Sequence, residues 1–124
     1  ERRCLADEEA RARRRERDGE RRARDDVELR TRFAAEISRL FPGCPPRRAD
    51  AIAHQATVRG SGRIGRSAVG RTVEADAVEL AVVASIRHQD TAYDDLLMTG
   101  VARADARDRV RAEVDDVLAR WRRG

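Results

Sequence analysis

The stretch that decides the fold class is "EADAVELAVVASIRH", residues 74–88. Its Val, Leu, Ala and Ile residues leave it apolar nearly all round, a pattern that a buried helix and a buried strand share. Glu74 and Asp76 open the stretch, as the positive end of a helix dipole favours, and no hairpin signal flanks it. We therefore expect a helix over 74–88 at the centre of the protein, with a strand as the rival interpretation.

Helical periodicity also marks the segments on the N-terminal side. An apolar stripe over 27–41 ends at "FPGCPP", residues 41–46, because proline and glycine cannot continue the helix. The proline at position 46 suits the start of a second helix over about 46–58. The inward-facing residues expected on these two helices are Val27, Phe33, Ala34, Ile37, Leu40, Phe41, Ala49, Ile52, Ala53 and Ala56.

Two further helices are expected on the C-terminal side. The "TAYD" of residues 91–94 has the form of a capping box, in which Thr91 accepts from a helical amide and Asp94 reaches back to the cap. It predicts a short helix through Met98 that Gly100 ends. The last helix covers about 102–122, and its apolar face consists of Val110, Val114, Val117, Leu118 and Trp121.

The N-terminal segment is of a different kind. Residues 1–26 carry ten arginines and nine acids, with Leu5 and alanines as the apolar residues. A helix without an apolar stripe is solvated, or it docks on nucleic acid or on an upstream part of a longer protein. We expect a longer protein because the chain begins with Glu1 and has its only methionine at position 98. The fold predicted is all-α: an irregular bundle of four to five helices in a compact domain 27–124, with a long charged helical extension 1–26.

Composition narrows the classes of function. Of the 124 residues, 40% are charged and 3% are aromatic, too few aromatic side chains for a platform on which bases stack. No apolar run approaches eighteen residues and no leader pattern opens the chain, so we expect no membrane span and a cytoplasmic location. All 27 basic residues are arginine, which a GC-rich genome explains, so only their placement is informative.

That placement is uneven. Residues 47–71 hold six arginines and the single acid Asp50, a balance of +5, whereas the rest of the chain has a balance of −1. The positive charge is therefore concentrated in one fifth of the sequence. The six arginines are Arg47, Arg48, Arg59, Arg63, Arg66 and Arg71.

Within this basic stretch, Gly60, Gly62 and Gly65 form a GxGxxG. A dinucleotide fold needs a strand before this motif, but the preceding residues predict a helix, and a Walker loop needs a lysine that the chain lacks. What remains is a glycine loop whose amides and arginines could bind phosphate. The alternative is a glycine-rich connection with solvated arginines.

A second polar cluster, "RHQDTAYDD" at residues 87–95, contains Arg87, His88, Thr91, Tyr93 and Asp94. Acid–base or phosphoryl-transfer chemistry would need His88, Tyr93 and Asp94 to converge with Arg63 and Arg66 on one cleft. We favour a structural role, in which they cap helices and Tyr93 packs with its hydroxyl exposed.

No cofactor or metal is expected. His54 and His88 lack the close spacing of zinc ligands, and His54 is expected to be a partly buried side chain with satisfied hydrogen bonds. The two cysteines, Cys4 and Cys44, should stay reduced.

Three stretches together resemble the bacterial and fungal family named domain of unknown function 2293: "LFPGCPPRRADAIAHQATVRGSGRIGRS", "AVELAVVASIRHQDTAYDDLLMTGV" and "ARDRVRAEVDDVLARW". The resemblance covers about 27–121 and brings no established activity. It implies that the family's fixed points fall on Gly60, Gly62, Arg63, Gly65, Arg66, Arg87, His88, Thr91, Tyr93 and Asp94.

The function expected from these observations is a non-catalytic module that associates with the phosphate backbone of DNA or RNA. The first alternative is an interaction module that forms a homo-oligomer or meets an upstream domain, through the N-terminal helix or through the end of the chain that carries Trp121. A phosphoryl-transfer or hydrolytic enzyme is the less favoured alternative.

Overall fold

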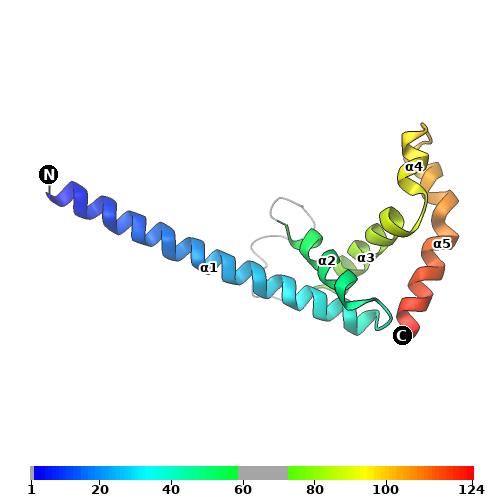
Figure 1. The fold of residues 1–124 in the computed structure, drawn as a ribbon, viewed down its shortest axis with the longest axis horizontal. Coiled ribbons are helices and arrows are strands. Elements are labelled where there is room, and N and C mark those ends of the chain that lie inside the picture. Colours follow the sequence, from blue (N-terminus) through cyan, green and yellow to red (C-terminus); the bar gives the residue numbers. More distant parts are fainter. Residues whose placement is uncertain (1, 59–72) are drawn as a thin grey trace.

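The structure is a computed structural model, and it describes residues 2–58 and 73–124 (Figure 1). Regular structure within these ranges is entirely helical, which confirms the predicted all-α class and rejects the strand interpretation of 74–88. The five helices are α1 (Arg2–Leu40), α2 (Pro46–Thr57), α3 (Ala75–Asp90), α4 (Tyr93–Met98) and α5 (Arg103–Arg123).

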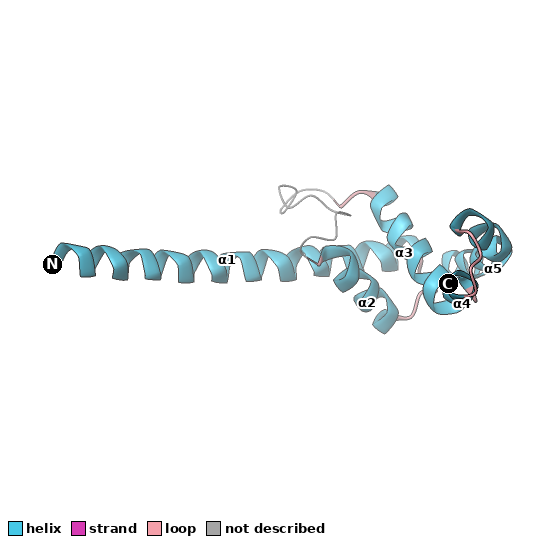
Figure 2. Ribbon diagram, turned by 90° about the horizontal axis from the view of Figure 1, so that it is seen from above, coloured by secondary structure: helices cyan, strands magenta, loops and turns pink. Residues whose placement is uncertain are grey.

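Helix α1 is the longest element and its N-terminal half projects away from the other helices (Figures 1 and 2). At 1.5 Å per residue its 39 residues span about 58 Å. The helix runs unbroken through Gly19 and through residues 26–27 into the packed region. Its first buried side chain is Leu29, whereas Val27, expected in the core, is 50% exposed. The buried row is Leu29, Phe33 and Ile37, four residues apart, and Val27 falls outside it.

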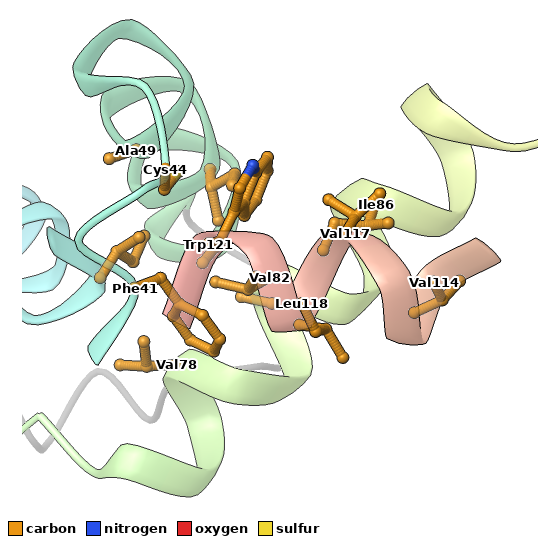
Figure 3. Packing of buried hydrophobic residues seen from close by; sticks show 14 of the residues in the cluster. Phe41, Cys44, Ala49, Val78, Val82, Ile86, Val114, Val117, Leu118 and Trp121 are labelled. Carbon is orange, nitrogen blue, oxygen red and sulfur yellow. The ribbon is translucent and has the colours of Figure 1, made fainter. Parts of the chain in front are cut away.

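The prediction that residues 74–88 lie at the centre of the bundle is correct for most of α3. This helix packs against all four other helices, and Val78, Val82 and Ile86 are fully buried. Figure 3 shows these side chains in one cluster with Phe41 and with Val117, Leu118 and Trp121 of α5. Leu80, however, is 69% exposed, because no described helix covers the side of α3 on which it lies.

The turn between α1 and α2 is attached to the C-terminal end of α5. The amide of Gly43 donates a 2.7 Å hydrogen bond to the carbonyl of Trp121. A side chain at position 43 would lie 2.9 Å from the backbone of Arg120 and Trp121, so glycine is needed for this close approach. The contact brings the C-terminus beside the α1–α2 turn, as Figure 1 shows.

The two cysteines differ in their exposure, and this difference predicts their reactivity. Cys4 is exposed on α1, whereas Cys44 is 4% exposed, and burial raises the pKa of its thiol to about 11. At pH 8 about one Cys44 in a thousand is then a thiolate, the form that reacts. A thiol reagent should modify one cysteine quickly in the folded protein and two after denaturation. The Cys4→Ser variant should show no fast phase, and a fast phase in that variant would contradict the buried position of Cys44.

Candidate functional site

Two of the six arginines in the basic stretch lie among the described residues. Arg47 and Arg48 occupy the first turn of α2, where Arg47 is exposed and Arg48 is partly buried. The structure describes α2 as far as Val58 and resumes at Val73, just before α3. The other predicted phosphate-binding residues lie outside the described ranges; they are Arg59, Gly60, Gly62, Arg63, Gly65, Arg66 and Arg71.

Arg48 connects three helices. Its Nε donates to the Ser85 hydroxyl at 3.1 Å, and its Nη2 donates to Asp90 Oδ2 at 2.6 Å. The guanidinium also lies 5.3 Å from the centre of the Trp121 ring, a cation–π contact. The Arg48 and Asp90 side chains are 23% and 30% exposed, so solvent screens this ion pair only in part. The guanidinium of Arg48 is therefore already committed to a carboxylate of the protein.

We expect the Arg48→Ala variant to lose about 1–3 kcal/mol of the free energy of unfolding, because Asp90 and Ser85 lose their charged donor. Urea denaturation measures this change. Arg47→Ala is the matched control, since it removes the neighbouring but exposed arginine and should change stability by at most about 0.5 kcal/mol. Equal losses in the two variants would contradict the role assigned to Arg48.

A groove of about 570 Å³ separates α2 from α3 next to this ion pair. Four alanines line it, and Gln55, Ser85, His88 and Gln89 provide polar groups. The Ser85 hydroxyl lines the same groove as His88, but it accepts the hydrogen bond from Arg48. Ser85 and Asp90 were not predicted as partners of Arg48, because they follow it by 37 and 42 residues and no local pattern relates them.

The second polar cluster is brought together around Tyr93, which is 6% exposed. His88 Nδ1 donates to Asp94 Oδ1 at 2.5 Å, and the His88 ring meets the Tyr93 ring edge to face at 5.4 Å. The guanidinium of Arg87 lies 5.5 Å from the centre of the same ring, and its Nε is buried without a hydrogen-bond partner. The cluster thus joins the last turn of α3 to the first turn of α4.

The capping box predicted for residues 91–94 is wrong in its detail. The Thr91 hydroxyl accepts from the Tyr93 amide at 3.2 Å and donates to the carbonyl of Arg87. Asp94 binds His88 instead of reaching back to the helix cap. The reason is that the short turn between α3 and α4 brings the imidazole within reach, and a ring N–H is a good partner for a carboxylate.

The sequence model of one protein family, described as Uncharacterized conserved protein (DUF2293), matches residues 36–122. The chain belongs to this family. The region that DUF2293 covers runs from the last residues of α1 through nearly all of α5, and so includes both Arg48 and the Tyr93 cluster. No curated protein and no solved structure matches the chain.

The two histidines of this DUF2293 chain both interact with side chains of the protein. Arg30 Nη1 donates to His54 Nδ1 at 3.0 Å, which requires an unprotonated Nδ1. His54 is exposed, not partly buried as predicted, because it lies outside the buried row of α2, which is Ala49, Ile52, Ala53 and Ala56. Within residues 2–58 and 73–124, no three His, Cys, Asp or Glu side chains are grouped so that they could hold a metal ion. The same ranges contain no helix whose length and apolar character would allow it to span a bilayer.

The arrangement around His88 can orient an imidazole but does not by itself make a catalytic centre. Its Nδ1–H is held by Asp94, and both side chains are about half exposed, at 48% and 54%. The enzyme interpretation needs Arg63 and Arg66 to converge with this cluster on one cleft, and these two arginines lie outside the described residues. Among the described residues, the contacts of His88, Tyr93 and Asp94 link α3 to α4, and this favours a structural role.

Proposed function

We propose that this DUF2293 protein is a non-catalytic module that binds the phosphate backbone of nucleic acids through residues 47–71. The observation that carries the proposal is the balance of +5 in this stretch of a chain whose remainder has a balance of −1. Since Asp90 pairs with Arg48, five arginines remain for phosphate contacts: Arg47, Arg59, Arg63, Arg66 and Arg71. Arg47 supports the proposal because it is exposed at the start of α2.

Contacts of this kind position a protein on nucleic acid without reading the bases. A guanidinium suits them because it can donate two parallel hydrogen bonds to one phosphate. Each neutralised phosphate releases condensed counterions, so that affinity falls steeply as salt rises. The module would therefore bind DNA or RNA with little preference for sequence.

The double variant Arg63→Ala with Arg66→Ala tests the proposal. We expect about a tenfold or greater loss of affinity for a random-sequence duplex. The slope of the logarithm of the binding constant against the logarithm of the salt concentration, here called the log–log slope, should become shallower by about two units. Fluorescence anisotropy at several salt concentrations measures both quantities.

The matched control is Arg103→Ala with Arg109→Ala, which removes the same charge from exposed positions of α5. It should leave the slope unchanged. Unchanged binding by the Arg63/Arg66 variant, or an equal loss in the control, would overturn the proposal.

The projecting half of α1 supports a second candidate function, an interaction or oligomerisation module. Residues 3–24 are exposed except for Ala10 and Gly19, which are partly buried, so a partner could reach this half of α1 along its length. Light scattering distinguishes the candidates. A mass above that of the 14.0 kDa chain, together with no binding of DNA or RNA, would favour oligomerisation.

A further inference from the structure

The projecting half of α1 has one side on which arginines outnumber acids. Five arginines follow one another at spacings of one, three, four and three residues, which places them on one side of a helix. All five are exposed. We name this group the Arg17 patch; its members are Arg13, Arg14, Arg17, Arg21 and Arg24.

Arg17 itself is surrounded mainly by like charge. Its neighbours one turn away are Arg13 and Arg14 on one side and Arg21 and Glu20 on the other. Glu20 is the one acid among these four positions. Arg21 also has an ion pair with Asp18, but at 3.7 Å and with both side chains more than half exposed it is weak.

The continuity of α1 fixes the direction in which the patch points. Counting back by sevens from the buried Leu29 leads to Arg22 and Arg15. The same count from the exposed Thr31 leads to Arg24 and Arg17. Because a seven-residue step nearly preserves the face of a helix, the Arg17 patch lies on the side of α1 away from the core. The packed helices leave it open, as Figures 1 and 2 show for this half of α1.

The two sides of this half of α1 differ in their balance of charge, although both carry acids. The patch side has Glu9, Glu16 and Glu20 beside its five arginines, a balance of +2. On the core side, Arg11, Arg15 and Arg22 each have acids three or four residues away on the helix. Their acidic neighbours are Asp7, Glu8, Asp18, Asp25 and Asp26. With three arginines against these five acids the core side has a balance of −2, and the near balance of ten arginines and nine acids over 1–26 conceals this difference between the two sides.

The dimensions of the helix decide whether the acids cancel the patch. A helix with its side chains is about 10–12 Å across, whereas the Debye length is about 8 Å at 0.15 M salt. A charge in contact with the patch is thus largely screened from the acids on the opposite side. The patch side therefore presents five arginines against Glu9, Glu16 and Glu20, a local balance of +2, although the segment as a whole is nearly neutral.

We propose that the Arg17 patch binds the phosphate backbone of double-stranded nucleic acid. The inference rests on the proposed function and adds a second contact surface to it. Arg13 and Arg24 are eleven residues apart, about 17 Å along a straight helix, which suits the stiff backbone of a duplex. A single strand is flexible and is bound mainly by stacking on aromatic side chains, and residues 2–26 contain none.

A second copy of the chain fits the patch less well. Exposed ion pairs between mixed-charge helices contribute about 0–1 kcal/mol each, because both partners give up water and side-chain freedom. A duplex carries a dense line of phosphates whose condensed counterions are released on contact. The same arginines therefore gain more from a duplex than from the acids of another α1.

The test compares two triple variants of the full chain that have the same composition and net charge. Arg13→Gln, Arg17→Gln and Arg24→Gln remove three members of the patch. Arg11→Gln, Arg15→Gln and Arg22→Gln remove three arginines with the same spacing of four and seven residues from the core side. Glutamine keeps a high helix propensity, and circular dichroism checks that α1 remains helical in both variants.

The probe is a random-sequence 30-base-pair duplex, titrated at several salt concentrations. The patch variant should show a log–log slope shallower by about 2.7 units, that is, three lost phosphate contacts, and the core-side variant should keep the slope of the parent. Equal changes in both variants, or no change in either, would overturn the inference. The Arg63/Arg66 variant separates the two proposals, since its loss of binding tests residues 47–71 whatever the patch does. Tighter binding of a single strand of equal length would also contradict the preference for a duplex.

Discussion

The Phe33→Ala variant is expected to lose about 3–5 kcal/mol of the free energy of unfolding. Phe33 is completely buried in the middle of the core row of α1, and it is among the largest fully buried side chains described. Its removal takes away the transfer free energy of an aromatic ring and leaves a cavity between α1 and the helices packed on it. A domain of this size is stable by about 5–15 kcal/mol, so the variant should be close to unfolding. Urea denaturation followed by circular dichroism measures the loss.

Val27→Ala is the control for Phe33, since Val27 lies on the same helix but is 50% exposed. It should cost less than about 1 kcal/mol. In the structure the buried part of α1 begins at Leu29. A similar loss of stability in the two variants would contradict this boundary.

The Gly43→Ala variant should be destabilised by about 1–3 kcal/mol, although it adds only one methyl group. The added Cβ would lie 2.9 Å from the Arg120 carbonyl oxygen and from the Trp121 Cα, which are backbone atoms that cannot rotate away. To make room, the α1–α2 turn must move off α5, and the 2.7 Å hydrogen bond from Gly43 to Trp121 lengthens. Thermal and urea unfolding both report the loss.

Gly19→Ala makes the same chemical change where the structure offers free space. A Cβ at position 19 meets nothing within 4 Å, and alanine favours a helix by up to about 1 kcal/mol over glycine. This control should therefore gain helicity and lose no stability. A gain of stability in the Gly43 variant would contradict the close contact between the turn and α5.

The helices themselves could be predicted from local chemistry. Proline at position 46 marks where α2 begins, and the apolar spacing of residues 110–121 marks the side of α5 that is buried. The observed ends of α2 and α5 agree with the predicted ends within two residues. Leu80 shows the limit of such patterns. The sequence shows that a residue is apolar and on which side of its helix it lies. Only the arrangement of the other helices decides whether that side is covered, and the side that carries Leu80 is not.

The side-chain partners could be predicted much less well. Asp94 had an acceptable local partner in the cap of its own helix, yet it binds His88 because the turn between α3 and α4 brings the ring close. Arg48 meets Asp90 through the packing of α2 on α3, which no spacing in the sequence encodes. The phosphate-binding role of residues 59–71 falls outside the described residues and stays a prediction from charge.

The measurement that tests the central claim most directly is the salt dependence of binding by the unaltered protein. With about five phosphates contacted by residues 47–71, the affinity for a random-sequence duplex should fall with a log–log slope of about −4 to −5 between 50 and 200 mM salt, and the patch on α1 would steepen it further. A slope near zero, or no binding at 50 mM salt, would contradict the proposal that this protein binds phosphate backbones.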